Sequence, residues 1–141
     1  GIIWSSLQAN TQDNAADGNA AGFGGQTNYY FTVHPNSNVN VDFCVKADTA
    51  PPFDPEGDLV SGANQIPRDP NYKVDSNLNG QGPNLIDSIV MPIIFTKLEL
   101  EVQPGFGAYF RFWLSVPPNQ APGTPYTNQI NFEGVRATTA C

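Results

Sequence analysis

Residues that commonly carry catalysis are few and scattered along this chain. Its single histidine, His34, lies beside Pro35 in a turn, and the sequence contains no nucleophile elbow, HExxH helix, phosphate-binding loop or dinucleotide fingerprint. Glu99 and Glu101 would lie about 7 Å apart on one strand face, a spacing at which paired carboxylates can hydrolyse glycosides. Lys97 on the same face makes a solvated strand surface the stronger interpretation. The chain is therefore predicted not to be an enzyme.

A polar stretch in the middle of the chain matches half of a calcium-binding loop. Asp75, Asn77 and Asn79 are followed by Gly80, as in the pattern D-x-[DN]-x-[DN]-G. That spacing brings three oxygen ligands around one cation. The twelfth position is Ile86 rather than glutamate, so an ordinary Asn-Gly turn is the other interpretation. We expect no cofactor, with a structural calcium ion at this turn as the alternative.

Two cysteines remain, and their chemistry depends on whether they meet. Cys44 and Cys141, with one distant histidine, make a poor zinc site. A disulfide would instead tie the last residue of the sequence to an early strand and close a loop of about 97 residues, stabilising the fold by at most about 4.7 kcal/mol. Such a bond indicates an oxidising compartment or a hyperthermophile. Alternation around Cys44 places it on the polar strand face, outside the core or along its edge.

The composition excludes several classes of protein. The 141 residues are enough for one domain, and thirteen acidic against six basic residues give a net charge of −7. That charge argues against binding to nucleic acid or to an anionic membrane surface. No apolar run approaches the roughly 18 residues of a membrane span, so no membrane insertion of the mature form is expected. Abundant Gly, Pro and Asn favour an all-β fold with long loops.

Alternating apolar and polar residues mark the strands that must position these groups. Each predicted strand carries apolar side chains on one face, as Phe110, Phe112, Leu114 and Val116 do. Such strands build an antiparallel β-sandwich of the immunoglobulin-like or jelly-roll-like kind, here over residues 27–141. The predicted strands cover residues 27–33, 38–47, 89–102 with a break at Pro92, 108–116 and 126–137.

Two features of this sandwich suggest further contacts. Residues 48–85 contain six prolines and are predicted to form a long irregular excursion, with a short strand near residues 72–74. Tyr109 and Trp113 lie on the outward face of their strand, and large aromatic rings on a sheet surface are usually covered. The cover would be the excursion, another subunit or a sugar ring, and the last would make the chain a carbohydrate-binding module.

The sequence opens with an apolar segment that is followed by a polar tether. Residues 1–9, GIIWSSLQA, carry four large apolar side chains: Ile2, Ile3, Trp4 and Leu7. Residues 10–26 are small and polar, which is typical of a flexible tether. A segment that is apolar on both faces suits a strand held centrally in a sandwich. Residues 1–9 would either complete their own sandwich as a first strand or enter a different subunit.

Two stretches of the chain resemble one protein family. Residues 30–47, YFTVHPNSNVNVDFCVKA, resemble the second and third strands of archaeal bundling pilins, secreted β-sandwich relatives of the bacterial biofilm fibre protein TasA. Residues 109–118, YFRFWLSVPP, with residues 121–132, APGTPYTNQINF, resemble that family's closing hairpin, although Pro125 is inserted where the last strand usually starts. The two stretches together cover about a third of the chain.

The resemblance implies a structural subunit of an extracellular pilus or biofilm-matrix filament. In this family each sandwich lacks a strand, which an amino-terminal segment of the neighbouring subunit supplies by donor-strand complementation. The partner is then another copy of the chain, and the product is a helical homopolymer. Residues 1–9 would be the donor strand and residues 10–26 its tether. A secreted carbohydrate-binding or adhesive module is the alternative, and an unrecognised hydrolase is a third.

Overall fold

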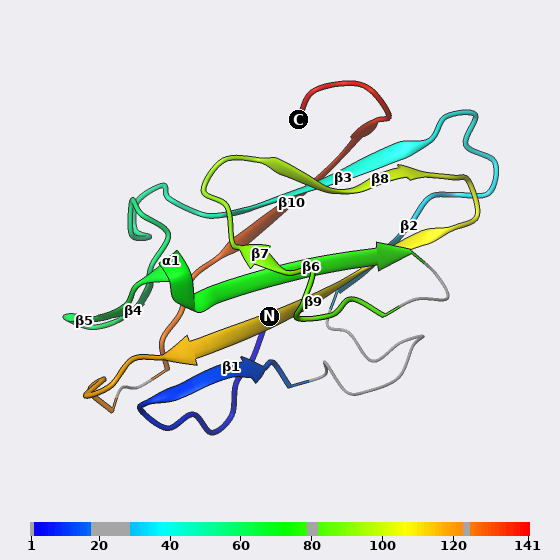
Figure 1. Cartoon of the computed structure of the whole chain (residues 1–141). Helices are drawn as coiled ribbons and strands as arrows, with labels where there is room; N and C mark the ends of the chain where they lie inside the picture. Colours follow the sequence, from blue (N-terminus) through cyan, green and yellow to red (C-terminus); the bar gives the residue numbers. More distant parts are fainter. Residues whose placement is uncertain (1, 18–28, 79–81, 123–124) are drawn as a thin grey trace.

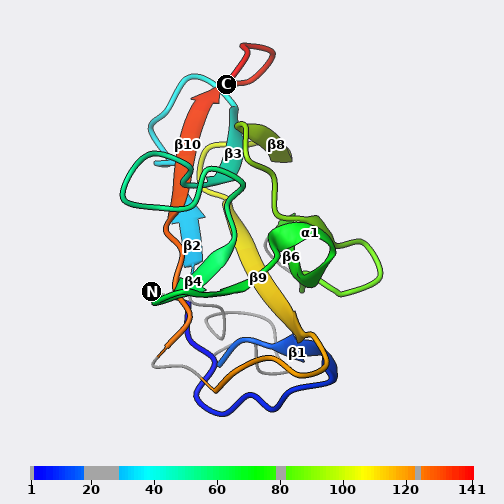
Figure 2. The same ribbon diagram turned by 90° about the vertical axis from the view of Figure 1, so that its left-hand side faces the viewer.

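The computed structural model describes residues 2–17, 29–78, 82–122 and 125–141, and it confirms an all-β, antiparallel fold. Most strands belong to two sheets, which form separate layers in Figures 1 and 2. The elements are β1 (Thr11–Ala15), β2 (Tyr29–Thr32), β3 (Val41–Ala47), β4 (Leu59–Ser61), β5 (Asn64–Ile66), α1 (Arg68–Asn71), β6 (Tyr72–Leu78), β7 (Ile89–Val90), β8 (Thr96–Val102), β9 (Gly107–Val116) and β10 (Ile130–Arg136).

The long strand β9 organises the larger sheet. It pairs with β6 on one side, and β7 continues the sheet beyond β6. On its other side β9 pairs with β2 along its first half and with β1 along its second half, so these two short strands follow one another along the same edge. The face of β9 predicted to point inward is buried, as alternation requires. The large apolar side chains buried on this face are Phe110, Phe112, Leu114 and Val116.

The smaller sheet has the strand order β10-β3-β8 and covers the inner face of the larger one. Aromatic rings fill the space between the two layers on the side of β2 and β10. The ring of Phe132 in β10 lies 4.9 Å from those of Tyr29 and Phe31 in β2, measured between centroids. Contacts at this distance are typical of favourable aromatic packing. The predicted sandwich core is therefore confirmed.

The prediction that residues 48–85 form an irregular excursion is wrong for much of this range. Strands β4 and β5 form a small hairpin, and β6 is a full strand of the larger sheet rather than a short one near residues 72–74. Prolines before and after β6 obscure its alternating pattern in the sequence. Between β5 and β6 lies α1, which spans four residues. No helix in the described ranges is long and apolar enough to cross a membrane.

Residues 10–26 were expected to be a flexible tether, and this is wrong for their first part. Residues 11–15 form β1, and Ala16 is buried in the core with its N–H bonded to the carbonyl oxygen of Phe112. Side chains help to hold this strand: the Asn14 amide donates to the Leu114 carbonyl, and Lys73 forms an ion pair of 2.7 Å with Asp13. The rest of the expected tether, residues 18–26, lies outside the described residues.

The predicted disulfide between Cys44 and Cys141 is present and pins β10 beside β3. Cys44 lies on the face of β3 opposite Phe43 and Val45, outside the core cluster as expected, yet this residue has no exposed surface. The C-terminal tail explains its burial. Residues 137–141 fold over the outer face of β3, where Ala137 donates to the Asn40 carbonyl and Thr138 donates to the Asp42 carboxylate. Both faces of β3 are thus covered.

Candidate functional site: a groove beneath the N-terminal segment

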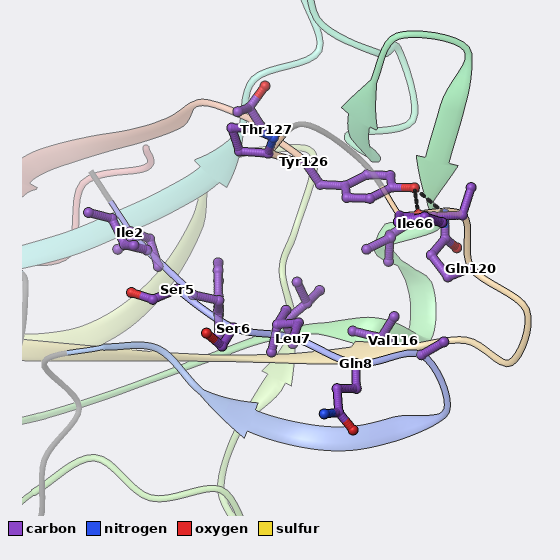
Figure 3. Close-up of a pocket in the computed structure, with 17 residues that line it drawn as sticks. Ile2, Ser5, Ser6, Leu7, Gln8, Ile66, Val116, Gln120, Tyr126 and Thr127 are labelled. Atoms are coloured by element: carbon purple, nitrogen blue, oxygen red, sulfur yellow. Dashed lines mark hydrogen bonds between the residues drawn. The ribbon is translucent and has the colours of Figure 1, made fainter.

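A groove with a cavity of about 810 Å³ separates the N-terminal segment from the body of the sandwich. Its floor comes from the end of β9, where Leu114 and Val116 point inward. Ile66 of β5 and Tyr126 lie on the opposite side of the cavity from Leu7 (Figure 3). Gln120 donates to the Tyr126 hydroxyl, which in turn donates to the Ala121 carbonyl. Among the described residues the lining consists of residues 2–9, Ile66, Leu114, Val116, residues 120–122 and residues 125–127.

Trp4 is the best-held side chain of the N-terminal segment. Its ring meets that of Tyr72 edge-on at 5.7 Å, and its indole N–H donates to the Asn14 carbonyl oxygen at 2.9 Å. Ile2, Trp4 and Leu7 are half-buried against the core, whereas Ile3 keeps 57% of its surface exposed. Of the four residues predicted to form a donor strand, three therefore contact their own subunit in the single chain.

The segment lies in its groove without forming a strand. Residues 2–9 belong to no β-ladder, and their neighbours hold them by scattered contacts. Asp17 donates its N–H to the Ile3 carbonyl at 2.8 Å and accepts a hydrogen bond from the Ser5 N–H at 3.0 Å. Residues 10–17 therefore do not act as a flexible tether for this segment. Strand β1 and the residues just after it bring it back.

The chain runs from the groove lining, at Thr127, into β10, an edge strand of the smaller sheet. Within the described ranges β10 pairs only with β3, so the other edge of β10 carries no ladder. A second cavity of about 360 Å³ adjoins the start of β10 and is lined by Ile2, Trp4, Tyr29 and Ile130, among others. An open strand edge beside apolar cavities is a site where an added strand gains both main-chain hydrogen bonds and buried surface.

The outward aromatic residues are covered by the chain itself. Tyr109 and Trp113 are both buried, as predicted. The ring of Tyr30, directly opposite in β2, stacks on that of Tyr109 at 4.2 Å. Trp113 lies opposite Ala15 of β1 and next to Lys73 of β6. Burial raises the pKa of Tyr109, helped by its hydrogen bond and its proximity to Tyr30. Neither ring presents an open face on which a sugar could stack.

The half calcium loop does not adopt a loop conformation where it is described. Asp75 and Asn77 belong to the extended strand β6, and Asn79 lies outside the described residues. The Asp75 carboxylate accepts a hydrogen bond from the Asn84 N–H, and the Asn77 amide oxygen accepts one from the Leu78 N–H. Within the described ranges no cluster of three acidic, histidine or cysteine residues is arranged to hold a metal ion.

Glu99 and Glu101, the carboxylate pair on β8, have different surroundings. Glu101 is exposed, but Glu99 is half-buried and accepts a hydrogen bond of 3.0 Å from the Ser76 hydroxyl of the other sheet. Burial raises the pKa of Glu99, and the nearby Asp75 charge adds to the rise. Burial likewise raises the pKa of Asp75, with a further contribution from Asp87. The interpretation of Glu99 as part of a solvated strand face is therefore wrong.

No protein family, curated protein or solved structure compared with this chain matches it. The groove itself was partly foreseeable. The alternation of β9 predicts the inward positions of Leu114 and Val116, and the N-terminal residues stand out by their hydrophobicity. Ile66 was missed as a groove residue because it lies in a proline-rich stretch without a periodic pattern, and Tyr126 because it was assigned to the start of the strand predicted over residues 126–137.

Proposed function

We propose that this protein is the structural subunit of an extracellular filament that assembles by donor-strand exchange. Residues 1–9 of one subunit would enter the groove of the next and add a strand to the open edge of β10. The observation that carries the proposal is an apolar segment that lies, without strand pairing, beside two cavities, the smaller of which reaches the start of the edge strand β10. The resemblance to bundling pilins and TasA, based on residues 30–47, 109–118 and 121–132, supports the same function.

Energetics favour the exchanged arrangement. Complete burial of Ile2, Ile3, Trp4 and Leu7 contributes roughly 6–12 kcal/mol before ordering costs, and the single chain realises only part of it because Ile3 is exposed. Each main-chain hydrogen bond gained along β10 would add about 1 kcal/mol. The donor and acceptor surfaces differ, so the contact is head-to-tail and propagates into an open filament.

Strand β1 limits how far the donor can reach. If β1 stays paired with β9, only the residues before Thr11 can extend towards another subunit. Residues 2–10 span at most about 30 Å when extended. That length is comparable to the width of a small domain. Neighbouring subunits would therefore be in direct contact, with no long linker between them.

An extracellular location is part of the proposal. The Cys44–Cys141 disulfide is compatible with secretion, because such bonds persist in oxidising surroundings. A surface built from neutral amides and few charges is also suited to dense packing of subunits.

The substitution Ile3→Ala tests the proposal without disturbing the monomer. Because Ile3 is 57% exposed in the single chain, its truncation should leave the free energy of unfolding nearly unchanged. In a donor strand it would be buried, so filaments seen by electron microscopy should become fewer and shorter. Ile86→Ala is the matched control, since Ile86 is 94% exposed and lies outside the groove lining.

Deletion of residues 1–9 gives a second, direct test. The truncated chain should remain monomeric, and a synthetic GIIWSSLQA peptide should bind it and raise its melting temperature. Normal polymerisation of the truncated chain would contradict donor-strand exchange through this segment, as would Ile3→Ala filaments identical to those of Ile86→Ala.

A further inference from the structure

Asp17 joins the N-terminal segment to the body of its own subunit through three hydrogen bonds. Its carboxylate accepts from the Ser5 N–H at 3.0 Å, and the Ser5 hydroxyl donates to the same oxygen. Its own N–H donates to the Ile3 carbonyl at 2.8 Å. These contacts fall in the middle of the four apolar residues, between Ile3 and Leu7. They therefore hold the apolar part of the segment rather than its flank.

The position of Asp17 is fixed by the sheet. Ala16, its neighbour, is buried in the core and donates its N–H to the Phe112 carbonyl of β9 at 3.0 Å. The ladder between β1 and β9 precedes it directly. Asp17 thus directly follows a residue that is bonded to β9, and a hydrogen bond to it fastens the segment to the sandwich.

Apolar packing alone does not explain why the segment stays in its groove. A cavity of about 810 Å³ lies along it, and Ile3 points largely into solvent. Close packing would have filled that space, as it does in protein interiors. Besides the contacts of Asp17, the Trp4 indole bond to the Asn14 carbonyl also comes from the β1 side of the groove. Polar contacts with residues 14–17 therefore contribute much of the retention.

We propose that Asp17 is a latch that stores the donor segment on its own subunit until assembly. This inference rests on the proposed function and concerns its regulation. A segment attached to its own groove competes at millimolar effective concentration with the segment of any other subunit. Opening the Ser5–Asp17 contact is then a required step before strand exchange, and it slows the growth of filaments from monomers.

Asp17→Ala in the full chain tests the latch, and it has a readout that needs no filament. The Trp4 indole N–H is hydrogen-bonded only while the segment is in place, so its solvent exchange, followed by NMR in dilute monomer, reports opening. Asp17→Ala should speed this exchange and the rate of filament growth about tenfold, since it removes two hydrogen bonds to a carboxylate. The signal is assigned by its loss in Trp4→Phe.

Two further variants distinguish the loss of the Asp17 hydrogen bonds from the mere loss of a negative charge. Glu56→Ala removes the same charge from an exposed loop residue and should behave as the unchanged protein. Asp17→Asn keeps an acceptor oxygen and should show an intermediate rate. The latch proposal is contradicted if the Trp4 indole proton exchanges with solvent equally slowly in Asp17→Ala and in Glu56→Ala. If that happens while the GIIWSSLQA peptide still binds the truncated chain, donor-strand exchange stands without the latch. If the peptide fails to bind but Asp17→Ala speeds indole exchange, the contact is real and the filament proposal is wrong.

Discussion

The indole nitrogen of Trp4 lies 2.9 Å from the carbonyl oxygen of Asn14, and this bond connects the N-terminal segment to the strand that follows it. Asn14 is itself tied to β9, because its side-chain amide donates to the Leu114 carbonyl. The segment is therefore attached to the central strand of the larger sheet through one intermediate residue. Its retention in the single chain depends on contacts with the region between residues 10 and 17.

Replacing Trp4 separates its hydrogen bond from its ring contact. Trp4→Phe keeps an aromatic ring against Tyr72 but removes the donor to Asn14, so the free energy of unfolding should fall by about 1 kcal/mol. Trp4→Ala also removes the ring and should cost about 2 kcal/mol, less than a fully buried tryptophan because this one is half-buried. Urea denaturation measures both. Equal stability of the two variants would show that the ring contact with Tyr72 contributes nothing.

Filament formation should separate the same two variants more sharply. In a donor strand the ring fills a groove of the next subunit, so Trp4→Ala should weaken or abolish assembly whereas Trp4→Phe retains it. Electron microscopy and sedimentation at matched concentration would measure this. Assembly of Trp4→Ala at the normal rate and length would contradict the role of Trp4 as the main anchor of the donor strand.

The strand pattern of the sequence predicts the body of the fold but not its edges. Strands β3, β9 and β10 are long and alternate clearly, and they appear where expected. Strand β1 has no apolar alternation, and besides its ladder it is held by the Asp13 N–H, which donates to the Ser115 hydroxyl, and by the Asn14 side chain. Those partners lie about 100 residues away along the chain, which no local pattern reveals.

In strand β8 one irregularity changes which residues face inward, so the alternating pattern predicts them incorrectly. The pattern predicts Leu98, Leu100 and Val102 on the inner face, yet Leu100 is 55% exposed while Glu99 is half-buried. The register with β3 shifts between Val41 and Phe43, and Glu101 adopts a positive φ of 52°. A bulge of this kind changes which face each residue occupies. Its position depends on the partner strand, so alternation within β8 alone does not predict it.

Gly107 is predicted to be the least replaceable glycine among those described. A Cβ atom there would lie 2.4 Å from the Tyr30 ring and 2.8 Å from the Phe31 carbonyl oxygen. Gly107→Ala must therefore move β2 or the Tyr30–Tyr109 stack, and such overpacking typically costs about 1–3 kcal/mol. Gly134→Ala is the control, because its nearest contact would be an ordinary 3.4 Å. Thermal unfolding of the two variants should differ clearly, and equal melting temperatures would contradict the tight contact.

Glu99→Gln should stabilise the protein at neutral pH. The half-buried carboxylate has a raised pKa, so the folded protein binds its proton more tightly than the unfolded chain does. Its contribution to stability is therefore unfavourable near neutral pH and is relieved as the pH falls through the raised pKa. Glutamine keeps an acceptor for Ser76 without the charge, and the gain should be a fraction of a kcal/mol because solvent screens this site.

The matched control for this substitution is Glu101→Gln on the same strand. Glu101 is exposed, so its variant should follow the pH dependence of the unchanged protein. Urea unfolding between mildly acidic and neutral pH would measure both. If Glu99→Gln gained no stability relative to Glu101→Gln at neutral pH, desolvation of Glu99 would not be the dominant effect.

Removal of the disulfide should loosen the C-terminal tail and change the acid stability of the fold. The double variant Cys44→Ala, Cys141→Ala avoids leaving a buried thiol, and it opens a loop of 97 residues. On the chain-entropy model it should lower the free energy of unfolding by at most about 4.7 kcal/mol. The tail also donates the Thr138 N–H to the buried Asp42 carboxylate, a contact that should weaken with it.

Asp42 makes this loss visible as a change in pH dependence. Burial alone would raise the pKa of Asp42, but the Glu101 N–H, the Lys97 ammonium and the Thr138 N–H together hold it below its usual value. The stability that these contacts supply is present above the pKa of the unfolded chain and is lost as the pH falls through the folded value. Without the Thr138 contact, the double variant should lose less of its remaining stability on acidification than the unchanged protein. Urea denaturation at neutral and at acid pH tests this, and parallel pH profiles would show that the tail stays in place without its disulfide.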